Sequence, residues 1–119
     1  MTRTAALLAL AAPLAAHGEG ARLALDCAGA DDTARTFVFA PVEVDAEGIG
    51  RITVGEDARP GIAAGFFGPW SWTADKVRTT LMVNGDAGDD GVPMLLHELD
   101  TTTTPFTATL TELTCEAPF

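Results

Sequence analysis

The sequence predicts an all-β domain, a small antiparallel sandwich or barrel of about 6–8 strands, with its N- and C-terminal strands linked by a disulfide. Three observations support this fold class. Apolar residues recur with a period of two along much of the chain. Turn signals rich in Gly, Asp and Asn separate these stretches. The two cysteines, Cys27 and Cys115, stand near the two ends of the predicted domain.

The first residues have the features of a bacterial export signal. A short cationic start at 1–3 precedes an apolar Leu- and Ala-rich run at 4–16, and Ala16-His17-Gly18 offers a small-x-small cleavage site. The run is too short to be a permanent membrane anchor. We therefore expect a secretory signal peptide at 1–18 and a single exported, soluble β domain at 19–119. That domain would be periplasmic or secreted, with no membrane insertion after processing.

The two cysteines predict a structural disulfide. An isolated even pair in an exported protein is typical of disulfide bonding. The chain has no CxxC motif, and two thiolates alone do not complete a zinc tetrahedron. A Cys27–Cys115 bond would close a loop of nearly the whole domain, for which the chain-entropy model gives about 4–5 kcal/mol. It would also bring the first and last strands close together.

Three strands are expected in the first half of the domain, at 23–27, 35–44 and 51–54. The second of them contains a change of parity. Phe37 and Phe39 share one face, whereas Val42 and Val44 fall on the other. Pro41 stands at the change, so we expect a bulge or a sheet edge there.

The middle of the chain is expected to be irregular, because residues 55–69 hold four glycines and two prolines, which argue against a long helix or a central strand. Further strands are predicted at 76–83, 92–99 and 106–115. Within the last of these, Ala108 and Leu110 have one parity. Leu113 and Cys115 have the other, so we expect a second bulge between the two pairs.

The segment at 66–72 (FFGPWSW) contains four of the eight aromatic residues of the chain, and two roles are open for it. Phe66, Phe67, Trp70 and Trp72 could fill the core of a small β domain, because aromatic side chains bury the largest areas. Alternatively, they form a partly exposed platform, a candidate binding surface for a ligand or a protein. Trp70 and Trp72 point to the same side if this segment is extended.

The glycine-rich loop that follows the strand at 76–83 is a candidate calcium site. Asn84, Asp86, Asp89 and Asp90 offer the clustered oxygen ligands that calcium prefers on a flexible turn. Their spacing differs from that of an EF-hand loop, which ends in a bidentate glutamate. The same residues also suit a solvated hairpin loop, where Asp and Asn favour tight turns. No other cofactor is expected.

The charge of the chain limits its partners. Seventeen acidic and seven basic residues give a formal net charge of −10 at pH 7. That field repels nucleic acid and anionic membrane surfaces, so neither is expected as a partner. A basic protein is the class of partner that the charge favours. The sequence leaves the oligomeric state open.

Few side chains are suited to catalysis. Ser71 is the single serine, tyrosine and glutamine are absent, and His97 is the single histidine after residue 18. No nucleophile-elbow motif surrounds Ser71. We therefore favour an exported, non-catalytic binding or interaction domain that recognises a basic protein. A calcium-binding structural or adhesive domain, and a small hydrolase using Ser71 or His97, are the alternatives.

Overall fold

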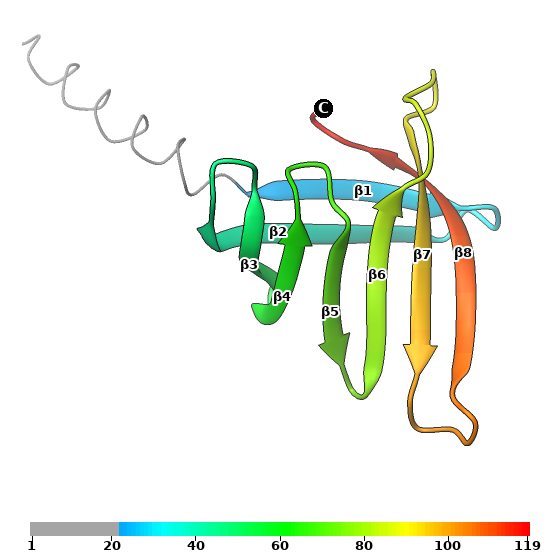
Figure 1. The fold of residues 1–119 in the computed structure, drawn as a ribbon. Coiled ribbons are helices and arrows are strands. Elements are labelled where there is room, and N and C mark those ends of the chain that lie inside the picture. The colour runs from blue at the N-terminus through cyan, green and yellow to red at the C-terminus, as the bar shows by residue number, and fades with distance from the viewer. Residues whose placement is uncertain (1–21) are drawn as a thin grey trace, which may run out of the picture.

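The computed structural model describes residues 22–119, which form eight antiparallel strands closed into a barrel (Figure 1). The strands are β1 (Leu23–Gly29), β2 (Ala34–Val44), β3 (Ile49–Val54), β4 (Arg59–Ala64), β5 (Trp70–Ala74), β6 (Val77–Val83), β7 (Val92–Asp100) and β8 (Thr107–Glu116). Each strand pairs with the next along the chain, and β8 pairs with β1. The expected all-β antiparallel fold is confirmed, and its form is a barrel. The predicted signal at 1–18 lies outside the described residues.

The long strand β2 turns the sheet through a corner. Its first half pairs with β1 and its second half with β3, so β1 and β2 cross the upper ends of the other strands (Figure 1). The register shifts by one residue here, since Pro41 lies opposite Ile52 but Glu43 lies opposite Arg51. Val42 is the extra, exposed residue of this bulge. The irregularity expected at Pro41 is therefore confirmed.

A disulfide joins Cys27 of β1 to Cys115 of β8, as the sequence predicts. The two cysteines lie directly opposite each other with a Cα–Cα distance of 3.9 Å, and both are buried. β1 and β8 share only four paired positions, so the covalent bond lies in one of the short seams of the barrel. The first and last strands are thus neighbours.

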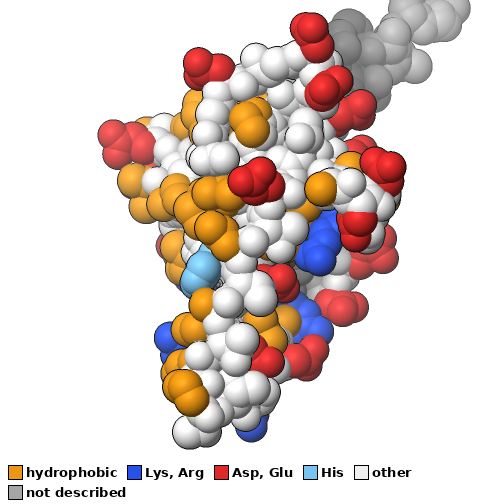
Figure 2. Space-filling model, turned by 90° about the vertical axis from the view of Figure 1, so that its right-hand side faces the viewer, with side chains coloured by type: hydrophobic (Ala, Val, Ile, Leu, Met, Phe, Trp, Pro, Cys, Tyr) orange, Lys and Arg blue, Asp and Glu red, His pale blue; other side chains and the backbone are white. Residues whose placement is uncertain are grey.

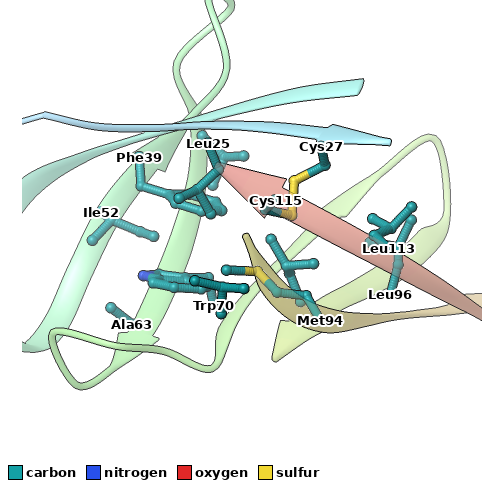
Figure 3. Packing of buried hydrophobic residues seen from close by; sticks show 13 residues of the cluster. Leu25, Cys27, Phe39, Ile52, Ala63, Trp70, Met94, Leu96, Leu113 and Cys115 are labelled. Carbon is teal, nitrogen blue, oxygen red and sulfur yellow. A yellow bond between two sulfur atoms is a disulfide. The ribbon is translucent and has the colours of Figure 1, made fainter. Parts of the chain in front are cut away.

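Aromatic side chains fill the middle of the core. Trp70 is 2% exposed, and its ring stacks on that of Phe39 with 4.9 Å between centroids. Figure 3 shows Trp70 beneath Phe39, with Met94 beside it. Trp72 is partly buried and tilts against Phe37 and Phe39. Both tryptophans therefore point inward from β5 and bury large apolar surfaces in a domain of modest size.

The expectation of no central strand within residues 55–69 is wrong, because β4 pairs with both β3 and β5. The amide of Ala64 donates to the carbonyl of Pro69, so even-numbered amides of β4 point toward β5. Pairing with β5 begins only at Gly61, and the strand therefore loses no ladder hydrogen bond at Pro60. A Cβ on Gly61 would lie 2.9 Å from the carbonyl oxygen of Ser71, so glycine permits the close approach of the two strands.

The second bulge, expected within β8, is also absent. The β7–β8 register is unbroken from Val92 opposite Cys115 to Asp100 opposite Thr107. Buried Cys115 and Leu113 therefore fix the inner face of β8, and Leu110 points outward with 61% of its surface exposed. The change of apolar parity has a different cause. The first half of β8 extends beyond β1, where neither face belongs to the core.

Candidate functional site

A concavity of about 500 Å³ lies along the seam between β1 and β8 and carries four carboxylates. They come from three separate parts of the chain: the β1 end and its turn, the β6–β7 loop, and the end of β8. The lining residues are Asp26, Cys27, Ala28, Gly29, Asp32, Asp90, Thr114 and Glu116. None of them is cationic. We call this concavity the acidic hollow.

The disulfide register creates a like-charge pair in the acidic hollow. Because Cys27 lies opposite Cys115, their neighbours Asp26 and Glu116 lie opposite each other. The cysteines point inward, so the two acidic side chains point outward on the same surface. Directly opposed residues have Cβ atoms about 4.5–5.5 Å apart, and like charges at that position destabilise a sheet. The fold thus holds two carboxylates in a mutually repulsive arrangement.

Little within the described part of the chain relieves this repulsion. The hydroxyl of Thr36 donates a hydrogen bond of 3.1 Å to the Asp26 carboxylate. The two ion pairs formed among residues 22–119 join Arg51 to Glu43 and Arg59 to Asp57, away from β1 and β8. The carboxylates of the acidic hollow therefore have no ion-pair partner within residues 22–119.

Asp31 and Asp32, in the turn after β1, have different roles. The backbone amide of Thr33 donates to the Asp31 carboxylate at 3.1 Å, and the hydrogen bonds from Thr33 lower the pKa of Asp31. Asp32 adopts a left-handed backbone with φ of 63°, which aspartate tolerates better than most residues. Asp31 thus stabilises the turn, while Asp32 contributes its carboxylate to the acidic hollow.

Asp90 reaches the acidic hollow from the tip of a small hairpin. Gly88 and Gly91 exchange two backbone hydrogen bonds of 2.8 and 3.2 Å, which leave Asp89 and Asp90 at the tip. A Cβ on Gly91 would lie 2.5 Å from the carbonyl oxygen of Cys115, and its φ is 126°. Glycine is therefore required where this loop meets the end of β8.

The structure separates the four residues predicted as a calcium set. Asp90 lines the acidic hollow, whereas Asn84, Asp86 and Asp89 do not, and all four are exposed. Within residues 22–119, no group of three or more His, Cys, Asp or Glu side chains is placed to hold a metal ion. A calcium role for this loop stays a prediction.

The aromatic segment is likewise divided. Trp70 and Trp72 belong to the core, but Phe66 and Phe67 are 59% and 61% exposed on the β4–β5 loop. The ring of Phe67 meets that of Phe119 edge-on, with 4.9 Å between centroids. The four aromatic residues therefore do not form one platform. A binding role for the two exposed phenylalanines stays a prediction.

Ser71 and His97 lie on the outer face of the sheet, on strands separated by β6. Ser71 is opposite Thr80, which is opposite His97 on its other side. The hydroxyls of Ser71 and Thr80 are 3.1 Å apart and hydrogen-bonded. Strands two apart are about 9–10 Å apart, whereas a general base must approach its nucleophile to about 3 Å. This separation argues against His97 as the general base for Ser71, and a hydrolase role for either residue alone stays a prediction.

A larger groove, of about 740 Å³, lies on the outer face of β3–β6. Arg51 and Arg78 line it together with the hydroxyls of Ser71 and Thr80, and no carboxylate does. Arg51 is held by Glu43 at 2.9 Å. No carboxylate lines this groove, whereas four line the acidic hollow, so the acidic hollow better matches the negative charge of the chain.

Sequence reasoning missed Asp26, Asp32 and Glu116 as site residues. A signal for two of them was present, because Asp26 precedes one cysteine and Glu116 follows the other. In an antiparallel pair with opposed cysteines, these two flanking positions must also be opposed. The disulfide prediction therefore contained the like-charge pair.

No protein-family model, curated protein or solved structure matches this chain. Residues 22–119 also include no helix with the length and apolar character needed to cross a membrane. The chemistry of the described side chains is therefore the basis for a functional proposal.

Proposed function

We propose that this chain is an exported, non-catalytic binding domain that recognises a basic protein through the acidic hollow. The observation that supports this most directly is the opposition of Asp26 and Glu116, with Asp32 and Asp90 lining the same concavity. A lysine or arginine side chain placed between the opposed carboxylates would replace one repulsion with two attractions. The free domain gains nothing from the like-charge pair, so its benefit would arise on binding.

The remaining charge of the chain would assist the encounter. A net charge of −10 attracts a basic protein from beyond contact distance and raises the association rate. The disulfide suits the oxidising compartment expected from the predicted export signal. The short-range pair and the long-range field would therefore favour the same class of partner.

A hexalysine peptide is a suitable probe for the acidic hollow, and its affinity can be measured by titration calorimetry. The doubly neutralised variant Asp26→Asn/Glu116→Gln should bind about tenfold more weakly than wild type, which corresponds to the loss of two modest ion pairs. The matched control is Asp86→Asn/Asp89→Asn. It removes the same two charges from exposed positions outside the acidic hollow.

The comparison of these variants separates a local site from general attraction. We expect the control to lose less than about threefold in affinity, because exposed charges away from the contact are screened by salt. Equal losses in both variants would contradict the proposal, since the net charge would then explain the binding. Undetectable binding by the wild-type protein at about 20 mM salt would also contradict it, because screening is weak there.

A further inference from the structure

The first half of β8 has an open strand edge. β8 pairs with β7 throughout Thr107–Cys115, but with β1 only through Leu113–Glu116. β1 ends at Gly29, opposite Leu113, and none of the described residues pairs with the outer side of β8 before that point. Figure 1 shows this part of β8 at the free side of the sheet, clear of β1 and β2. The barrel is therefore closed at one end and continues as an open sheet at the other.

The hydrogen-bond phase shows which backbone groups are free on this edge. The amide of Asn84 donates to the carbonyl of Pro93, so odd-numbered residues of β7 face β6 and even-numbered residues face β8. Their hydrogen-bonded partners on β8 are odd-numbered. The N–H and C=O groups of Ala108 and Leu110 therefore point away from β7, toward the open side. The short Cα–Cα distance of the disulfide pair agrees with this phase, since hydrogen-bonded pairs are about 5.5 Å apart.

This edge lacks the features that ordinarily prevent strand pairing. Residues 107–111 (TATLT) contain no charge and no proline, and the register shows no bulge. Thr107–Leu110 is exposed, and the neighbouring Phe106 is also exposed. Figure 2 views the molecule from the side of β8, and white and orange atoms predominate in the middle and left of its lower half. A charge-free edge in a chain of net charge −10 is suited to an uncharged strand.

We propose that a second copy of this chain pairs with the edge, β8 to β8 and antiparallel, about a two-fold axis at Thr109. The phase requires outward-facing residues to pair with each other, so Ala108 of one copy lies opposite Leu110 of the other. Thr109 of one copy then lies opposite Thr109 of the other, and Thr107 of one copy lies opposite Thr111 of the other. The register sets a small side chain against a large one and threonine against threonine, pairings that stabilise antiparallel strands.

The charge distribution favours this occupant in this register. No carboxylate lies opposite another, because Glu112 of one copy would face Phe106 of the other. The two Ala108–Leu110 pairs satisfy the free backbone groups, and the two-fold axis closes the assembly as a dimer. Thr114 and Glu116 line the acidic hollow at the far end of β8, outside the positions 106–112 that pair in this register.

Salt separates this association from the recognition of a basic partner. Two copies of net charge −10 repel each other, so screening should strengthen the β8–β8 dimer. Screening should weaken binding of a cation to the acidic hollow. The two proposals therefore have salt dependences of opposite sign, and either can fail alone.

The test is sedimentation equilibrium of the purified chain at about 150 mM salt, with charges placed on the proposed axis. Wild type should be a dimer whose dissociation constant falls as salt rises. Thr109→Lys and Thr109→Glu should each weaken the dimer at least about tenfold, because like charges then face each other across the axis. An equimolar mixture of the two variants should restore a mixed dimer.

Thr73→Lys and Thr73→Glu are the matched controls, since Thr73 is an exposed strand threonine on β5, distant from the axis in the strand order. Both should dimerise as wild type does. Near-UV circular dichroism checks that each Thr109 variant keeps its tertiary packing. A wild-type chain that stays monomeric at millimolar concentration would overturn the proposal. So would Thr109 variants that dimerise normally, or single variants that are not rescued by mixing.

Discussion

Removing the disulfide should have the largest effect on stability of any change to the seam. Cys27 and Cys115 are separated by 88 positions in the sequence. The chain-entropy expression for a loop of that length gives about 4.6 kcal/mol at 25 °C. Domains of this size have total stabilities of about 5–15 kcal/mol. The double variant Cys27→Ala/Cys115→Ala should therefore lose a large part, and at least about 2 kcal/mol, of the free energy of unfolding.

The assay is equilibrium unfolding in urea, followed by the fluorescence of the buried Trp70. Wild type and variant should differ in midpoint while their m-values report how far each denatured chain expands. Chemically reduced wild type is the matched control, because it lacks the cross-link but keeps both sulfur atoms. We expect it to match the double variant within about 1 kcal/mol, since the stabilisation arises mainly in the unfolded chain.

Two outcomes would refute this reasoning. A loss below about 1 kcal/mol in the double variant would show that the four-residue seam between β1 and β8 holds without the covalent bond. A reduced wild type as stable as the oxidised protein would show that the effect of the variant comes from side-chain packing.

Three further changes test other parts of the structure. Asp26→Asn should raise the free energy of unfolding by about 0.2–1 kcal/mol by relieving the like-charge pair, and urea unfolding that shows no gain would count against that pair. Trp70→Ala should lose about 3–5 kcal/mol in the same assay because it empties the core, whereas Phe66→Ala should lose less than about 1 kcal/mol because that ring is exposed. Hydrogen bonds from Thr102 lower the pKa of Asp100, so its contribution to stability is present above the ordinary value of 3.8 and disappears as the pH falls through the lower folded value. The free energy of unfolding of Asp100→Asn should accordingly be lower than that of wild type at pH 6, and the two should converge at a pH low enough to protonate Asp100. A difference that stays constant with pH would argue against this assignment.

The fold could be predicted where one face of a strand is buried. Leu25 and Cys27 in β1 alternate with exposed residues, Leu81 in β6 lies between partly buried ones, and the sequence pattern identified both inner faces. The sequence pattern gave wrong predictions for β4 and β8. β4 is a paired strand despite its Pro60, because the missing amide faces a side where pairing has not yet begun. The parity change in β8 marks the end of the core, not a bulge.

The acidic hollow could be predicted only in part. The opposition of Asp26 and Glu116 follows from the cysteine pairing and antiparallel geometry. The position of Asp90 in the acidic hollow could not be predicted in this way. It depends on the contact of Gly91 with the backbone of Cys115, which is distant in the sequence. The grouping of Asp90 with Asp86 and Asp89 was a natural reading of one loop, but the fold places Asp90 among the acidic residues of other segments.

The most direct measurement of the central claim is a titration of the isotope-labelled protein with hexalysine, followed by amide chemical shifts. Recognition through the acidic hollow predicts that the largest shifts fall on its four acidic residues and the residues beside them, and that these shifts saturate together. The four are Asp26, Asp32, Asp90 and Glu116. The shifts should diminish as salt is raised. Shifts spread evenly over all acidic segments, with Asp57 and Asp86 moving as much as Asp26, would contradict the claim.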